Sequence, residues 1–101
     1  MKQIERVTPP TLDVLEVLLG ADAVWGLLVI KESGRNPGTV YPILDRLERL
    51  GWATSEWGDE PERSGPRRKY YALTAEGRDA AAALLAARRG TDPGQLRGAP
   101  A

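Results

Sequence analysis

Pro37 to Trp52 read PGTVYPILDRLERLGW, and this stretch decides the fold of the chain. Apolar residues recur along it at the spacing of one helix face, which predicts an amphipathic helix from Asn36 to Leu50. We expect Asn36 as the N-cap, Pro37 as the first helical residue and Gly51 as the residue that ends the helix. The apolar stripe consists of Val40, Ile43, Leu44, Leu47 and Leu50. One face of this helix must therefore pack, while the other is left for solvent or a partner.

A second helix is predicted directly upstream, from about Ala23 to Ser33, with Asp22 as its N-cap. It is apolar nearly all round, so we expect it to be buried on several sides. Only Gly34 and Arg35 separate it from the helix that begins at residue 36. Two helices joined by so tight a turn form a helix-turn-helix.

Two strands are predicted downstream, where the helical period stops. They run from Trp52 to Trp57 and from Arg67 to Leu73, and the polar stretch GDEPERSGP, residues 58–66, joins them. Together they form a hairpin with a charged tip.

Two outer helices complete the chain. One follows Thr8 as N-cap, has Pro9 at its first position and ends at Gly20. The other runs from Ala75 to Arg89 after the N-cap Thr74 and consists mostly of Ala and Leu. The predicted fold class is mainly α with a small β-hairpin (α+β), a winged helix-turn-helix in the order helix, helix, helix, hairpin, helix. The domain covers residues 8–89, between a flexible N-terminus at 1–7 and a disordered tail at 90–101.

Composition excludes several function classes. The 101 residues include no Cys and no His, which removes disulfides, zinc-thiolate sites, cysteine nucleophiles and the commonest general base. We find no Gly-rich phosphate loop and no acids at metal-ligand spacing, so we expect no enzyme, no metal and no cofactor. No apolar run is long enough to cross a bilayer and no export signal is present, so the expected location is the cytoplasm.

The exposed face of the residue 36–50 helix and the neighbouring hairpin form the candidate DNA interface. A helix with one free face fits a major groove about 12 Å wide, and a hairpin beside it reaches phosphates or the minor groove. The basic run from Arg67 to Lys69 concentrates positive charge there, although 14 Lys and Arg balance 14 Asp and Glu overall. The predicted contacts to DNA are Arg35, Asn36, Gly38, Thr39, Tyr41, Pro42, Arg46, Arg67, Arg68 and Lys69.

Several of these residues also have a purely structural interpretation. Asn36 is first an N-cap, Tyr41 could pack against the hairpin, and Arg46 could serve solvation or pair with a nearby acid. The three Trp residues are expected in the core rather than in a ligand cage. The neutral net charge favours a rival function, a winged helix that binds protein and has no role on DNA.

Two motifs resemble the PadR-type transcriptional regulators. PGTVYPILDRLERLGW resembles the family's recognition-helix signature, and RRKYYALTAEG, residues 67–77, resembles its wing strand and the start of its last helix. Trp25 and Gly26 match a further position, where an aromatic residue precedes Gly. The resemblance implies a repressor that binds a palindromic, inverted-repeat operator as a homodimer and is released by a small aromatic or hydrophobic effector. This chain departs from longer members, because one short Ala-rich helix replaces a helical C-terminal domain.

Dimerisation in the family uses the first and the C-terminal helices. Both helices carry apolar residues on more than one face here, so we expect the subunits to meet through them. The candidate dimer residues are Val14, Val17, Leu18, Ala81, Leu84 and Leu85, and Trp25 is the candidate effector residue.

Overall fold

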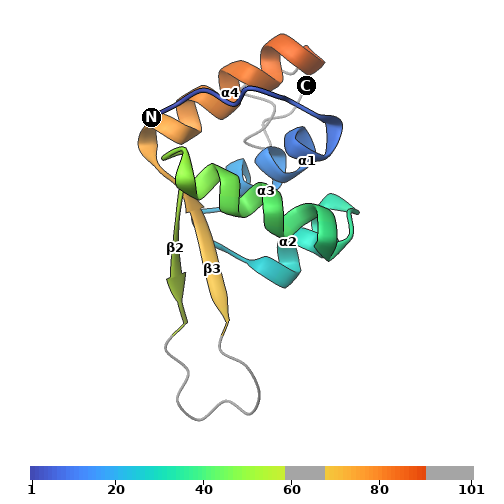
Figure 1. Ribbon diagram of the computed structural model, residues 1–101, viewed down its shortest axis with the longest axis vertical. Coiled ribbons are helices and arrows are strands. Elements are labelled where there is room, and N and C mark those ends of the chain that lie inside the picture. The colour runs from blue at the N-terminus through green and yellow to red at the C-terminus, as the bar shows by residue number, and fades with distance from the viewer. Residues whose placement is uncertain (59–67, 91–101) are drawn as a thin grey trace.

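A computed structural model describes residues 1–58 and 68–90 of the protein. The elements are α1 (Pro9–Leu19), β1 (Val24–Trp25), α2 (Gly26–Ser33), α3 (Pro37–Arg49), β2 (Ala53–Trp57), β3 (Lys69–Leu73) and α4 (Ala75–Arg89). Figure 1 shows the four helices packed together, with β2 and β3 projecting from them as a hairpin. The predicted winged helix-turn-helix is confirmed, and its helices and the two hairpin strands lie within three residues of the predicted limits.

The core is built by the apolar faces of α1, α3 and α4 over the sheet. Val40, Ile43, Leu44 and Leu47 on α3 are buried, as the stripe predicts. Leu15 and Leu18 of α1 and Leu85 of α4 have almost no exposed surface. Burial of this kind, at about 25 cal/mol per Å² of apolar surface, is the main stabilising contribution to so small a domain.

The sheet contains a strand that the sequence analysis missed. Its three antiparallel strands lie in the order β1-β3-β2, with Val24 opposite Tyr71 and Ala53 opposite Leu73. The predicted helix start at residues 22–23 is therefore wrong. Residues 24–25 are extended and α2 begins at Gly26, after Trp25, whose side chain makes no capping hydrogen bond.

Burial of α2 also differs from the prediction. Only Gly26 and Val29 of this eight-residue helix are buried, while Leu27 is 51% and Leu28 40% exposed. A helix of two turns has one side facing the core, and the surplus apolar residues lie on the outer side. Of the three tryptophans, Trp52 is buried, Trp25 is half-buried and Trp57 is exposed, so the core assignment is wrong for Trp57.

Local capping follows the sequence. The side chains of Thr8, Asn36 and Thr74 accept hydrogen bonds from the backbone N–H groups three residues later, which confirms three of the four predicted N-caps; the fourth, Asp22, is wrong, because α2 begins after Trp25. Thr74 also donates to the carbonyls of Gly51 and Trp52, at 3.1 and 3.3 Å. It thereby joins the start of α4 to the link between α3 and β2.

The N-terminal segment, residues 1–7, lies against the domain. The Lys2 N–H donates to the Leu50 carbonyl at 3.0 Å, and Trp52 Nε1 donates to the Lys2 carbonyl at 2.6 Å. Ile4 and Val7 pack on the core. Hydrogen bonds and apolar contacts thus hold a segment that the sequence analysis took to be flexible.

Two predicted segments, the hairpin tip and the tail, fall largely or wholly on residues 59–67 and 91–101, outside the described residues. Among the described helices, none combines the length and apolar character needed to cross a bilayer.

Candidate nucleic-acid interface

The outer face of α3 gathers the exposed residues of the candidate interface. Gly38, Tyr41, Pro42 and Arg46 are all exposed there, and Thr39 is half-buried. Asn36, also exposed, is engaged through Oδ1, which accepts from the Thr39 N–H at 3.0 Å. Its cap role is thus confirmed, and its contact with DNA stays a prediction.

Pro42 and Gly38 shape the first two turns of α3. Pro42 has no N–H to donate to the carbonyl of Gly38, four residues earlier. A Cβ added at Gly38 would meet only Asn36 Oδ1, at 3.4 Å. Internal packing therefore does not require glycine at this position.

Tyr41 stands over the start of α2. A Cβ on Gly26 would come within 3.1 Å of Tyr41 Cε1 and 3.5 Å of Tyr71 Cε1, so the absence of a side chain at Gly26 makes room for both rings. Tyr41 nevertheless stays 42% exposed, and its ring extends the outer face of α3. Burial, and then the nearby Glu48 carboxylate, raises the pKa of the Tyr71 phenol beneath it.

The described wing cations lie against aromatic rings. The guanidinium of Arg68 stacks 4.1 Å from the ring centre of Trp25, and Lys69 Nζ lies 5.3 Å from the Trp57 ring and 5.7 Å from that of Tyr71. Cation–π contacts of this kind orient a positive group. Both side chains are thus oriented at the base of the hairpin, while Arg67 lies outside the described residues.

Arg35 in the helix-turn-helix turn is engaged inside the protein. Its Nε donates to Asp13 on α1 at 2.8 Å, and Arg89 at the end of α4 binds the other oxygen of the same carboxylate at 2.9 Å. Arg89 also pairs with Glu16 at 2.9 Å. Burial alone would raise the pKa of Asp13, but the hydrogen bonds and charges of Arg35 and Arg89 outweigh it and lower the pKa below its ordinary value. Arg35 therefore serves to fix the turn that leads into α3.

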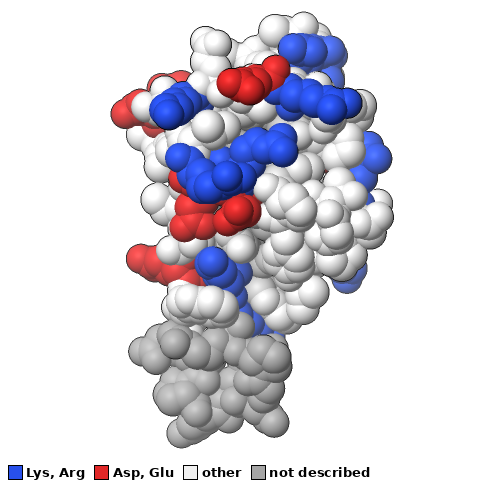
Figure 2. Space-filling view, in the orientation of Figure 1, with Lys and Arg blue, Asp and Glu red and all other residues white. Residues whose placement is uncertain are grey.

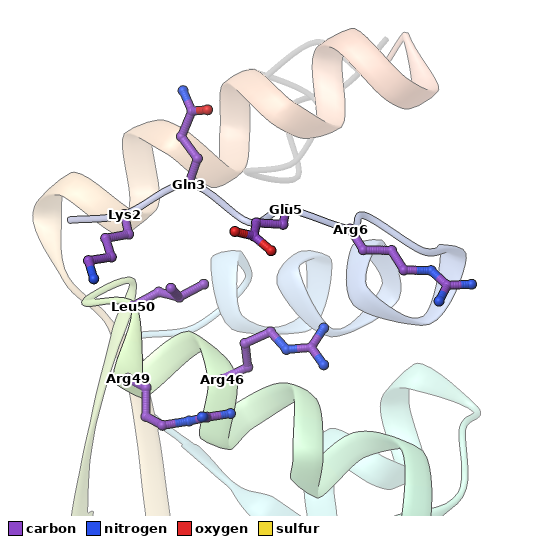
Figure 3. Close-up of a pocket in the computed structure, with 7 residues that line it drawn as sticks. All are labelled: Lys2, Gln3, Glu5, Arg6, Arg46, Arg49 and Leu50. Carbon is purple, nitrogen blue, oxygen red and sulfur yellow. The ribbon is translucent and has the colours of Figure 1, made fainter.

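The sequence analysis named Arg46 but did not place the other cations that lie near the far end of α3. A hollow of about 750 Å³ lies between the N-terminal segment and the last turns of α3. Its lining includes Lys2, Arg6, Arg46 and Arg49 (Figure 3). No local sequence signal places the N-terminal segment here, because its position depends on hydrogen bonds to residues about 50 positions away.

Four of the six candidate dimer residues do not lie on the surface of the subunit, so their assignment to a dimer contact is wrong. Val14, Leu18, Ala81 and Leu85 are at most 1% exposed and form the core of the subunit. Val17 and Leu84 are half-buried and keep some surface. The outer side of α4 carries Ala80, Ala83 and Leu84 instead, and they line a second hollow of about 620 Å³ with Ile4, Val7 and Trp52.

Trp25, the candidate effector residue, does not line that hollow; its ring lies beneath Arg68.

Within residues 1–58 and 68–90, no group of three acidic side chains could hold a metal ion.

Comparison with known proteins identifies a family. The model of the transcriptional regulator PadR-like family matches residues 14–83. No curated protein matches the chain.

Among solved structures, a PadR family transcription regulator from Clostridium difficile is 30% identical, with a TM-score of 0.64, over 78% of this chain and 88% of that one. PcaV, a transcriptional regulator from Streptomyces coelicolor solved with its natural ligand, is 26% identical, with a TM-score of 0.67, over 85% of this chain. A MarR family transcriptional regulator from Silicibacter pomeroyi is 25% identical, with a TM-score of 0.63, over 83% of this chain. This chain spans only 57% of the PcaV chain and 56% of the MarR family chain.

Proposed function

We propose, from the premise that this chain belongs to the PadR-like family of DNA-binding transcriptional regulators, that it represses transcription by occupying an inverted-repeat operator as a homodimer. The observation that carries the proposal is the outer face of α3. Gly38, Tyr41, Pro42 and Arg46 are exposed together on this helix, next to a hairpin whose base holds oriented cations.

The dimensions of the two partners support this proposal. An α-helix with its side chains is about 10–12 Å across, and the major groove is about 12 Å wide. With α3 in the groove, Gly38 at its slim N-terminal end is the closest backbone to the base edges, and Tyr41 and Arg46 extend from the same face. A two-fold dimer places two such helices about 34 Å apart, one turn of DNA, and requires an operator with matching symmetry.

The proposed subunit contact uses the outer side of α4, which keeps Leu84 from the residues first expected and replaces the buried ones with Ala80 and Ala83. Ala80, Ala83 and Leu84 recur there at helical spacing, beside the apolar side chains of Ile4 and Val7. Alanine buries little area, so the N-terminal segment must add surface for a stable dimer. Dimerisation then depends on two segments that the core already holds in place.

The hollow that these residues line is also the proposed effector site. It has about 620 Å³, within the range of small-molecule sites, and apolar side chains dominate its wall. PcaV was solved with a natural ligand, which supports ligand control in a related fold. We therefore move the proposed effector contact from Trp25 to the neighbourhood of Trp52, where binding of a small aromatic compound should alter Trp fluorescence.

Selection of bound duplexes from random-sequence DNA tests the function. We expect an enriched inverted repeat, and Tyr41→Ala should weaken binding to it while Tyr41→Phe separates the contribution of the hydroxyl group. Failure of the unmodified protein to enrich any sequence, together with capture of no duplex in a gel shift, would favour the protein-binding alternative.

Sedimentation tests the dimer. Leu84→Glu should yield monomers with sharply reduced affinity for the selected operator, because it places a charge in the apolar contact. Leu28→Glu is the matched control, since Leu28 is an exposed leucine on α2, away from α4. Equal dissociation of both variants, or a monomeric unmodified protein with full affinity for one half-site, would contradict the proposed contact.

A further inference from the structure

The hollow between the N-terminal segment and α3 carries an excess of positive charge. Lys2 and Arg6 come from the segment, Arg46 and Arg49 from α3, and Glu5 is the one acid in the lining. Figure 3 shows Arg6 on the N-terminal segment above and Arg46 and Arg49 on α3 below. Figure 2 shows blue side chains spread over this face above the hairpin, with red acidic side chains between them.

These charges are weakly neutralised within the protein. In the part of the chain that the structure describes, no acid lies within ion-pair distance of Lys2, Arg6 or Arg46. Arg49 pairs with Asp45 at 3.5 Å, but both side chains are 70% exposed, and such pairs contribute little. Like charges facing each other across a gap create a positive potential that attracts a polyanion.

The backbone that carries Lys2 is held in place. Its N–H donates to the Leu50 carbonyl and its carbonyl accepts from Trp52 Nε1, which ties the segment to the end of α3. Ile4 and Val7, on either side of Glu5 and Arg6, pack on the core. The cations of the segment are therefore presented beside α3 before any ligand arrives, which reduces the entropy that binding would cost.

We propose that this hollow binds the DNA phosphate backbone on the side of α3 opposite the wing, so that the N-terminal segment and the hairpin grip the two strands that border one major groove. The assignment rests on the proposed DNA-binding function and adds Lys2, Arg6 and Arg49 to its contacts. Arg46 supplies the continuity, because it belongs both to the outer face of α3 and to the wall of the hollow.

Geometry favours the DNA backbone as the occupant. A helix that fills the major groove has a phosphate strand on each side of it. Figure 1 shows the N-terminal segment and the hairpin on opposite sides of α3, the two places where those strands would pass. The wing presents Arg68 and Lys69 to one strand, and the hollow presents its four cations to the other.

The salt dependence of binding tests the assignment. Each phosphate contact contributes about 0.9 to the slope of log affinity against log salt. The variant Lys2→Gln with Arg6→Gln should therefore show a slope shallower by about two units per subunit, equally on the selected operator and on a mixed-sequence duplex. Lys2→Arg with Arg6→Lys should restore the slope, because it restores the charge.

The control removes a charge elsewhere. Lys31→Gln changes one exposed cation on α2, outside both hollows, and should leave the slope nearly unchanged. An equal loss of slope in this control would show that net charge, rather than the hollow, is responsible. Unchanged slope in the Lys2 and Arg6 variant would overturn the assignment and leave the proposed function intact, whereas absence of DNA binding by the unmodified protein would overturn the proposed function itself.

A small anion is the competing source of phosphate. Calorimetric titration with pyrophosphate should show no saturable binding at micromolar concentration, since the hollow is open and lies along the path of a polymer. Tight pyrophosphate binding that is lost in the Lys2 and Arg6 variant, with the DNA slope unchanged, would assign the hollow to a free anion instead and overturn the proposal.

Discussion

The first turns of α3 and α4 look alike in sequence and differ completely in their surroundings. Each has a polar N-cap, Asn36 or Thr74, and a glycine soon after it, Gly38 or Gly77. A Cβ at Gly77 would overlap the carbonyl of Trp52, whereas a Cβ at Gly38 would touch only its own cap residue. The turn of α4 is a closed joint within the fold, and the turn of α3 is an open surface.

The difference shows how similar capping signals serve two purposes. At α4 the cap residue also bonds the carbonyls of residues 51 and 52, and Gly77 is buried against the Trp52 carbonyl. At α3 the cap satisfies one N–H, and the residues around it are left to solvent. Substitutions in the first turn of α4 should therefore change folding, and substitutions in the first turn of α3 should change binding.

Gly77→Ala is expected to have the largest effect on stability. The added methyl group cannot be accommodated unless α4 moves away from the Trp52 carbonyl, and overpacking of this kind costs about 1–3 kcal/mol or more. Urea unfolding should show a lower midpoint with a similar slope. Retention of the unmodified midpoint would mean that the joint between α4 and the α3–β2 link is looser than the structure indicates.

Asp13 joins the turn before α3 to the far end of α4, because it binds both Arg35 and Arg89. Asp13→Asn should cost about 1 kcal/mol near neutral pH, since these side chains are only partly buried. The pKa of Asp13 is lowered from its ordinary 3.8, so its contribution is complete above that pH and is lost as the pH falls below it.

The measurement is urea unfolding of both proteins across acid pH. The stability gap between them should close below about pH 4. A gap that stays constant down to pH 2 would show that the ion pairs do not account for it. Asp79→Asn is a suitable control, because Asp79 is exposed on α4 and no ion pair is found for it among the described residues.

The sequence correctly predicted the structural features that depend on residues close together in the chain. Three of the four predicted N-caps and the buried stripe of α3 depend on residues within a few positions, and these were found as expected. Strand β1 was missed because its pairing partner, Tyr71, lies 47 positions after Val24 and the strand itself has only two residues. The N-terminal segment was misjudged for the same reason.

The rotation of α4 could not be predicted for a different physical reason. From Ala80 to Ala87 every residue is Ala or Leu, so no polar side chain marks the face that must avoid the core. Packing places Ala81 and Leu85 inside and leaves Ala83 and Leu84 toward the surface. The interface on α3 was easier to predict, because Tyr41, Pro42 and Arg46 interrupt an apolar stripe that identifies the buried face.

Gly38→Ala is expected to have the smallest effect on stability, with the opposite sign to that of Gly77→Ala. Alanine favours a helix over glycine by about 0.5–1 kcal/mol, and the only neighbour of the new methyl group is Asn36 Oδ1 at 3.4 Å. Thermal unfolding should therefore be unchanged or slightly raised. Affinity for the selected operator should fall, because the methyl group stands between the backbone of α3 and the base edges. If this variant is more stable and binds DNA less well, the weaker binding cannot come from loss of folded protein. That result would show that the first turn of α3 serves binding, whereas the first turn of α4 serves folding. Unchanged affinity would show that the first turn of α3 does not approach the DNA closely, and would shift the contact toward Tyr41 and Arg46 further along the helix.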